Sequence, residues 1–208
     1  MKRACSEKIY CRYIKRILDI ILSFVLLFFL LLPMFLIAVA IRSDSKGKAI
    51  FKQKRMGRGG KIFICYKFRS MYIDTPPKRP ASQFQESDKY VTRVGRFLRR
   101  TSLDELPQLF NVLKGDMSLI GPRPLICEEG DIHKKRMDGG VYRIRPGITG
   151  ISQITGRNLL CDEDKLRGDM YYLENLRMWL DIKILFRTIF KVAEGEGVRT
   201  AEKRQRKN

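Results

Sequence analysis

The chain has 208 residues, of which 42 are Lys or Arg and 22 are Asp or Glu, so its formal net charge is +20 at pH 7. This length accommodates one domain and a membrane anchor but is too short for two domains of ordinary size. The charge suits nucleic acid, the anionic cytoplasmic leaflet of a membrane or a phosphorylated small substrate, and composition alone does not choose among them. The five cysteines are widely spaced with no C-x-x-C pair, which argues against a disulfide framework or zinc site and for reduced cytoplasmic thiols.

The first predicted element is an uncharged apolar run at residues 20–41. A membrane-spanning helix needs roughly 20 such residues. The run is too long for a removed signal peptide and has no small-residue cleavage site. Hydropathy by itself therefore favours a plain transmembrane helix.

Two features favour a re-entrant helix instead, which enters and leaves on the same face of the membrane. Basic residues precede the run at 2–16 and follow it at 42–55, and basic flanks prefer the cytoplasmic side. Pro33 lies somewhat past the middle of the run, where a proline kinks a helix and can turn the chain back. From these residues alone, the spanning and re-entrant forms are about equally favoured.

Two short strands are predicted next. Residues 51–58 and 61–69 are joined by Gly57, Gly59 and Gly60, and the second run is rich in aromatic and β-branched side chains, which is typical of a β-hairpin. Residues 74–89 contain several prolines among polar residues and are predicted to form an exposed loop.

Helical patterns dominate the rest of the chain. Residues 92–100 are predicted to form a basic helix, residues 106–113 a short helix, and residues 167–192 contain the longest helical pattern. The apolar stripe of this last pattern is most simply core, although Trp179 with Lys183 and Arg187 equally suits a membrane interface.

Two segments rich in Gly and Pro and the only histidine are further candidate features. The segments 121–124 and 146–150 combine Gly and Pro and are predicted to form rigid turns, the first of which presets the backbone of Arg123. A Ser-His-Asp mechanism would have to use His133, the only histidine, but its basic neighbours favour a solvated helix face.

Asp104 and Glu105 are the most informative residues in the chain. They follow closely after Arg96, Arg99 and Arg100. A carboxylate can accept a phosphoryl group when cations or a metal neutralise the phosphate charge. Further candidate cations are Lys67 and Arg123, and Glu105 could hold Mg²⁺, which prefers oxygen ligands.

A structural interpretation of the same residues competes with this one. Residues 102–105 match a capping box, and for an isolated motif of this kind that interpretation is preferred. If the helix begins near Asp104, Pro107 is tolerated in its first turn, and Asp104 lies where backbone N–H groups face an anion.

Five sequence motifs follow one another along the chain, and together they form a specific pattern. They are Lys67-Phe68-Arg69-Ser70-Met71, the run from Thr101 to Ser118, Gly121-Pro122-Arg123-Pro124, Pro146-Gly147-Ile148-Thr149-Gly150 and Gly156-Arg157-Asn158. The set closely resembles the bacterial sugar transferases, the small monotopic phosphoglycosyl transferases that act on polyprenyl phosphate. The resemblance covers nearly the whole chain, whose length matches the minimal catalytic form of the family without an added transmembrane domain.

The resemblance implies an activity. The family moves a sugar-1-phosphate from a UDP-sugar to a polyprenyl phosphate, usually undecaprenyl phosphate, and releases UMP. This is the first membrane step in making capsule, O-antigen, exopolysaccharide or glycoprotein glycans at the cytoplasmic face of the bacterial inner membrane. Expected partners are therefore UDP-sugar, undecaprenyl phosphate, anionic inner-membrane lipid and downstream glycosyltransferases, with no nucleic acid.

The resemblance also implies site residues. Asp104 would attack the β-phosphorus to form a covalent phosphosugar, with Glu105 as its partner and Mg²⁺ as cofactor, held by both carboxylates. Substrate and phosphate binding would fall to further residues, namely Lys67, Arg99, Arg123, Arg157 and Asp169. Pro33 would form the membrane turn, which raises the re-entrant form above the spanning one.

Two positions depart from the family. Leu32 stands where relatives often have a serine before the membrane proline, and residues 159–161 replace a region that often contains a tryptophan. The expected fold is α+β: a small, mostly helical, membrane-associated domain with a short β-hairpin and an N-terminal re-entrant helix. Its expected divisions are the anchor at 1–42, a catalytic domain at 43–195 and a disordered basic tail at 196–208.

Two rival functions stay open at this point. A membrane-tethered nucleic-acid-binding protein would account for the charge and would bind DNA or RNA in a salt-dependent way. A catalytically inactive scaffold of a glycan-assembly complex is opposed only by the intact acid pair at positions 104 and 105.

Overall fold

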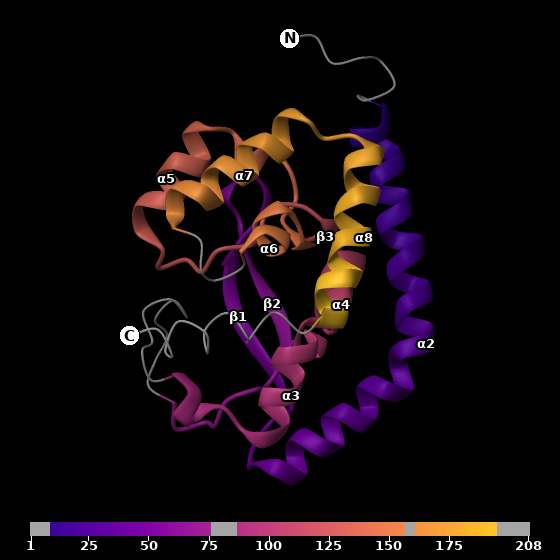
Figure 1. The fold of residues 1–208 in the computed structure, drawn as a ribbon, viewed down its shortest axis with the longest axis vertical. Coiled ribbons are helices and arrows are strands. Elements are labelled where there is room, and N and C mark those ends of the chain that lie inside the picture. Colours follow the sequence, from indigo (N-terminus) through magenta and orange to yellow (C-terminus); the bar gives the residue numbers. More distant parts are fainter. Residues whose placement is uncertain (1–8, 76–86, 157–160, 195–208) are drawn as a thin grey trace.

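Figure 1 shows the chain as a computed structural model, which describes residues 9–75, 87–156 and 161–194. The predicted tail at 196–208 and Arg157 lie outside these residues, as does most of the predicted loop at 74–89. Helices predominate, and the strands form two small two-stranded sheets. The mixed fold and the short antiparallel hairpin are as predicted.

The apolar run lies in one long helix, α2 (Lys15–Asp44), which follows a π-helical turn at Tyr10–Ile14. Within the described ranges it is the one helix long and apolar enough to cross a membrane. Pro33 lies inside α2, which is continuous through the proline and changes direction along its length (Figure 1). A proline bends a helix in this way because it lacks an N–H and its ring crowds the preceding turn.

One stripe of α2 faces the rest of the molecule. Ser23, Leu27, Met34 and Ile41 are buried, and their spacing of four or seven residues places them on one side of the helix. The other sides carry large exposed apolar residues, namely Phe24, Phe28, Phe29, Leu31, Leu32, Phe35 and Leu36. A helix with so much exposed apolar surface needs an apolar environment.

The hairpin consists of β1 (Ile50–Met56) and β2 (Ile62–Phe68), paired antiparallel with Gln53 opposite Cys65. Each strand begins and ends within two residues of its prediction. The connection is a 3-10 turn, Arg58–Gly60, in which Gly59 and Gly60 have positive φ angles of 70° and 72°. Side chains are rarely tolerated at such angles, so the glycine pair permits the tight connection.

The helices after the hairpin are partly as predicted. They are α3 (Arg93–Thr101), α4 (Gln108–Lys114), α5 (Gly130–Asp138), α6 (Ile151–Thr155), α7 (Asp162–Glu174) and α8 (Met178–Glu194), with 3-10 turns at Ser87–Tyr90, Leu103–Glu105 and Val141–Arg143. The predictions at 92–100 and 106–113 correspond to α3 and α4.

The single helical pattern predicted over 167–192 is wrong, because the chain breaks between α7 and α8. Asn175 ends α7 with a non-helical backbone. The apolar spacing nevertheless continues across the break: Tyr172, Leu176 and Ile184 pack in the same core cluster. Only part of the predicted apolar stripe is core, since on α8 Trp179 is 70% exposed whereas Ile184 is 1% exposed.

A parallel pair of three-residue strands, β3 (Ser118–Ile120) and β4 (Gly147–Thr149), was not predicted. The pair brings the two Gly-Pro turns together, since the Gly147 N–H donates to the Pro122 carbonyl at 2.9 Å. A Cβ on Gly147 would lie 2.1 Å from the Gly121 nitrogen, so this close approach requires glycine.

His133 does not lie on a solvated helix face as predicted. Its Nε2 donates to the Ile126 carbonyl at 2.7 Å, and its Nδ1 contacts the Tyr142 hydroxyl. Both ring nitrogens are therefore used inside the fold, in a half-buried setting that joins α5 to its neighbouring segments.

Candidate active site

The acid pair lies at the corner between α3 and α4. Asp104 and Glu105 belong to the 3-10 turn Leu103–Glu105, and Ser102 before it has a left-handed backbone with φ 59°. Asp104 therefore does not lie in the first turn of α4, which begins only at Gln108, after Pro107. The capping box is not formed either, because the Ser102 side chain does not cap the turn.

A fully buried amide fixes this corner against the hairpin. The Asn111 side chain on α4 donates to the Ile64 carbonyl at 2.7 Å and accepts from the Tyr66 N–H at 3.0 Å. These two hydrogen bonds join the backbone of β2 to a side chain of α4. The next residue of β2, Lys67, is brought over the turn that contains the acid pair.

Two cations converge on one carboxylate. Lys67 Nζ lies 2.8 Å from Glu105 Oε1, and an Nη of Arg123 lies 3.5 Å from the same oxygen. Burial by itself would raise the pKa of Glu105, but the Lys67 and Arg123 charges outweigh it and lower the pKa to about 2. Glu105 is therefore ionised throughout the physiological range.

Asp104 has a different environment. Burial and the neighbouring Glu105 charge raise the pKa of Asp104 to about 6, against the opposing charges of Lys67, Arg99 and Arg123. Within the described part of the chain its carboxylate has no hydrogen-bonding or ion-pair partner. It is a half-buried, ionisable carboxylate beside a group of cations.

Arg99 reaches this site from the last turn of α3. Its Nε donates to the Ser70 hydroxyl at 3.0 Å, which joins α3 to the segment after β2. The predicted residues Lys67, Arg99 and Arg123 are thus assembled around the predicted acid pair, although they come from three separate parts of the sequence.

The turn that carries Arg123 is held through its carbonyl groups. The Arg136 guanidinium donates to the Arg123 carbonyl at 2.8 Å, and Arg55 donates to the Pro124 carbonyl. Proline has no N–H, so these acceptors supply much of the bonding that fixes the turn. Arg55 and Arg136 were not predicted as site residues.

Local patterns could have indicated both arginines. Arg55 follows Gln53 by two residues in a strand and so shares its face, and its Nη donates to the Gln53 amide oxygen at 2.7 Å. Arg136 follows the buried Ile132 by four residues on α5, which places it on the buried face of that helix.

Asp169, which the resemblance implies as a substrate-binding residue, lies on α7 and is paired with an arginine. It is 2% exposed on α7 and forms an ion pair with Arg136, which is 1% exposed, while Ser152 donates to its other oxygen at 3.5 Å. Asp169 therefore contacts the site indirectly, through the arginine that binds the Arg123 carbonyl.

The acid pair also determines which cations the site can hold. Within the described residues, no three His, Cys, Asp or Glu side chains gather as a metal-binding group. Mg²⁺ needs fewer, because it is commonly held by one or two carboxylates together with substrate phosphates and water. Lys67 and Arg123 both contact Oε1 of Glu105, which leaves Oε2 of Glu105 and the Asp104 carboxylate as oxygen ligands. The residues present therefore fit a magnesium ion shared with a phosphorylated substrate.

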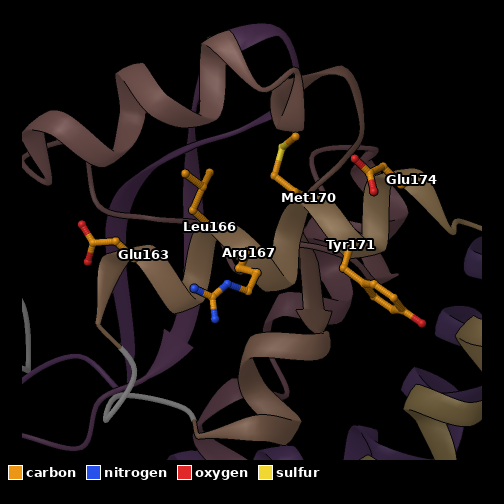
Figure 2. Close-up of a pocket in the computed structure, with 6 residues that line it drawn as sticks. All are labelled: Glu163, Leu166, Arg167, Met170, Tyr171 and Glu174. Carbon is orange, nitrogen blue, oxygen red and sulfur yellow. The ribbon is translucent and has the colours of Figure 1, made fainter.

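A separate pocket of about 460 Å³ lies on the outer face of α7 (Figure 2). All of its lining residues belong to that one helix: Glu163, Leu166, Arg167, Met170, Tyr171 and Glu174. None of them was predicted as a site residue, and Asp169 on the same helix is buried instead. The candidate active site is therefore the corner at Asp104 and not this surface.

Residues 10–195 match the profile of the bacterial sugar transferases. The chain belongs to this family. The match includes α2, the hairpin, the acid pair and both Gly-Pro turns of this bacterial sugar transferase.

Three similar proteins have names that specify different sugars. An undecaprenyl-phosphate galactose phosphotransferase of Salmonella typhimurium is 39% identical over 200 residues, covering 89% of this chain and 42% of the relative. An undecaprenyl-phosphate glucose phosphotransferase of Komagataeibacter xylinus is 44% identical, covering 84% and 35% respectively. A UDP-N-acetylgalactosamine-undecaprenyl-phosphate N-acetylgalactosaminephosphotransferase of Aeromonas hydrophila is 41% identical, covering 90% and 45%.

The sugar transferase chain therefore spans less than half the length of these relatives. Their identities to it fall within a narrow range while their named sugars differ. Overall similarity does not assign the sugar for this chain.

Proposed function

We propose that this protein transfers a sugar-1-phosphate from a UDP-sugar to undecaprenyl phosphate through a covalent intermediate on Asp104. The observation that carries the proposal is the pair of unlike carboxylates: Glu105 is neutralised by Lys67 and Arg123, whereas Asp104 beside it has no described partner. The names of the relatives, which specify UDP-sugars and undecaprenyl phosphate, support the choice of substrates.

In the first step, a carboxylate oxygen of Asp104 forms a bond to the β-phosphorus of the UDP-sugar. The bond from that phosphorus to the bridging oxygen breaks, and UMP leaves with its electron pair. Lys67, Arg99 and Arg123 supply positive charge where the diphosphate gathers negative charge in the transition state.

In the second step, a phosphate oxygen of the lipid attacks the same phosphorus. The bond to Asp104 breaks, its carboxylate is regenerated, and the product is a polyprenyl diphosphate sugar. A covalent intermediate divides one difficult transfer into two easier displacements at a single nucleophile.

Mg²⁺ is the proposed cofactor, held by Asp104 and Glu105 together with substrate phosphate oxygens. When bound, it would neutralise phosphate charge and polarise the phosphoryl group. The contribution of the protein is the placement of two carboxylates in a single 3-10 turn.

The apolar helix is proposed to be re-entrant, with both ends on the cytoplasmic side. At its start, Arg16 donates to the Val112 carbonyl at 2.7 Å, and Asp19 accepts from the Leu119 N–H at 3.0 Å. At its end, Asp44 accepts from the Val94 N–H at 3.1 Å. Both ends of α2 thus contact the same catalytic part of the chain, which supports a helix that does not cross to the other side.

Helix α8 supplies a second apolar surface for the membrane. Trp179, Phe186 and Phe190 are each more than half exposed on it. Lys183 and Arg187 on the same helix suit the anionic headgroups of an inner membrane. The proposed location of the site is the cytoplasmic face, where the lipid product would pass to downstream glycosyltransferases of a polysaccharide pathway.

The test is to trap the intermediate. Purified protein incubated with Mg²⁺ and each member of a UDP-sugar panel, without lipid acceptor, should gain the mass of the sugar-phosphate on the peptide containing Asp104. Asp104→Asn should abolish both the adduct and UMP release, because an amide oxygen is a poor nucleophile. Exposed Asp162→Asn on α7 is the matched control and should label normally. Active protein whose adduct is absent from that peptide would overturn the assignment.

A further inference from the structure

An apolar groove lies between the second arm of α2 and helix α3. It has a volume of about 530 Å³ and is lined by Leu36, Ile37 and Ala40 of α2 and by Arg93, Val94 and Phe97 of α3. In Figure 1 this arm of α2 runs beside α3. Leu36 is 58% exposed and Phe97 is 52% exposed, so the walls present open apolar surface.

The groove is continuous with the apolar surface of the membrane helix. Leu36 and Ala40 belong to the same arm of α2 as Phe35, which is 64% exposed. At Val94, which lines the groove, the two helices are joined, since Asp44 of α2 accepts from the Val94 N–H at 3.1 Å. An apolar chain can therefore enter the groove from the side of α2 that is proposed to lie in the membrane.

The groove also leads to the acid pair. Helix α3 runs from Val94 past Phe97 to Thr101, and the turn with Asp104 follows directly. At 1.5 Å per residue, Phe97 is about 6 Å along the axis from the end of α3. A molecule that contacts Phe97 with its apolar part can therefore present its polar head near Asp104.

The charge along α3 fits an anionic head. Four of its nine residues are arginine, at positions 93, 96, 99 and 100, and none is acidic. Arg93 lines the groove, Arg96 and Arg100 are exposed, and Arg99 lies beside Asp104. An apolar trough beside a row of guanidinium groups suits a lipid that carries a terminal phosphate.

We propose that this groove binds the first isoprene units of the polyprenyl phosphate acceptor and directs its phosphate to Asp104. The inference rests on the proposed function and adds a docking surface for the lipid. Ordinary membrane phospholipid is the competing occupant. The acceptor is favoured because the groove leads to the nucleophile and because its polar side is cationic.

The experiment separates the two half-reactions in nanodiscs of defined phospholipid. Phe97→Ala removes one wall and Ala40→Phe fills the groove, while Phe35→Ala is the control on an exposed residue of α2 outside it. Adduct formation from UDP-sugar alone reports the first step. Reaction of the preformed adduct with undecaprenyl phosphate reports the second.

Both groove variants should form the adduct at the wild-type rate and should raise the KM for undecaprenyl phosphate about tenfold, the effect expected for losing or blocking contacts of one aromatic ring. Phe97→Leu, which keeps an apolar wall, should lie close to wild type, as should Phe35→Ala. A photoreactive prenyl phosphate should label α3, and undecaprenyl phosphate should compete with it while phosphatidylglycerol does not.

Three results would overturn the inference. These are an unchanged KM in both variants, an equal loss in both half-reactions, and competition by phosphatidylglycerol as strong as by the acceptor. Failure of the wild-type protein to form any adduct would instead refute the proposed function, so the two failures are distinguishable.

Discussion

Asp104 and Glu105 are neighbours in the chain, but their pKa values are shifted in opposite directions. Lys67 and Arg123 share one oxygen of Glu105, which keeps that carboxylate ionised, while burial and Glu105 raise the pKa of Asp104. Placing two acids with separated pKa values in one site assigns them separate roles. This separation supports the proposal that Glu105 organises the cations while Asp104 reacts.

The buried pair of Arg136 and Asp169 gives a prediction at the residue scale. Arg136→Met should lower the free energy of unfolding by about 3–5 kcal/mol, because it leaves the Asp169 carboxylate buried without a countercharge. The double variant Arg136→Met/Asp169→Leu should recover most of that stability, since a buried ion pair can be replaced by apolar side chains.

Activity should not recover in the double variant. The Arg123 carbonyl still lacks its donor, so the guanidinium of Arg123 is no longer fixed beside Glu105. Unfolding in detergent and UMP release would be measured side by side, with the exposed pair Lys135–Glu163 as a control. Full recovery of both stability and activity would show that Arg136 has no positioning role.

Sequence patterns predicted the site better than its internal contacts. Lys67 on the second predicted strand and Arg99 on the predicted basic helix were both candidate cations from the sequence, and both lie beside the acid pair. Arg136 and Asp169 were missed as a pair because they lie 33 positions apart on different helices. No local period links two such residues, and only the packing of α5 against α7 brings them together.

At the element scale, predictions succeeded where a local period ends at a local signal. The hairpin is such a case, since its strands are separated by glycines with positive φ. They failed for α7 and α8, because the apolar period continues through Leu176 although the backbone breaks there. The strands β3 and β4 have three residues each, too few for alternation to be read.

The topology of α2 is the prediction at this scale. In a variant without native cysteines, Ile9→Cys before the helix and Lys48→Cys after it should both react with an impermeant maleimide only from the cytoplasmic side. The reason is that each end of α2 is bonded to the catalytic part. Inside-out and right-side-out vesicles would be compared, with Lys134→Cys on α5 as the cytoplasmic marker. Labelling at position 9 only from the periplasmic side would establish a spanning helix.

At the scale of the whole molecule, α2 and the helices on either side of the acid pair form one packed unit. Leu27, Met34 and Ile41 of α2 share a core cluster with Leu98 of α3 and Leu109 of α4. The turn that carries Asp104 lies between those last two helices. The position of Asp104 relative to α2 is therefore fixed by this packing.

Asp181 on α8 joins that helix to the start of α2 and to α7. One oxygen accepts from Tyr10 and from Lys15, each at 2.6 Å, and the other accepts from Tyr172 at 2.7 Å. Asp181→Leu would leave two buried hydroxyls and an ammonium without this partner. We expect a loss of about 3–5 kcal/mol in the free energy of unfolding.

The effect should be concentrated where α2 begins. Amide hydrogens of residues 10–19 should exchange faster in Asp181→Leu, because that end of the helix is no longer bonded to α8, while those of α5 should be unchanged. Asp162→Leu is the matched control, since its pair with Lys165 is about half exposed on the aspartate side and should be worth about 0–1 kcal/mol. Equal exchange at residues 10–19 in both variants would mean that apolar packing alone holds the membrane helix to the catalytic part.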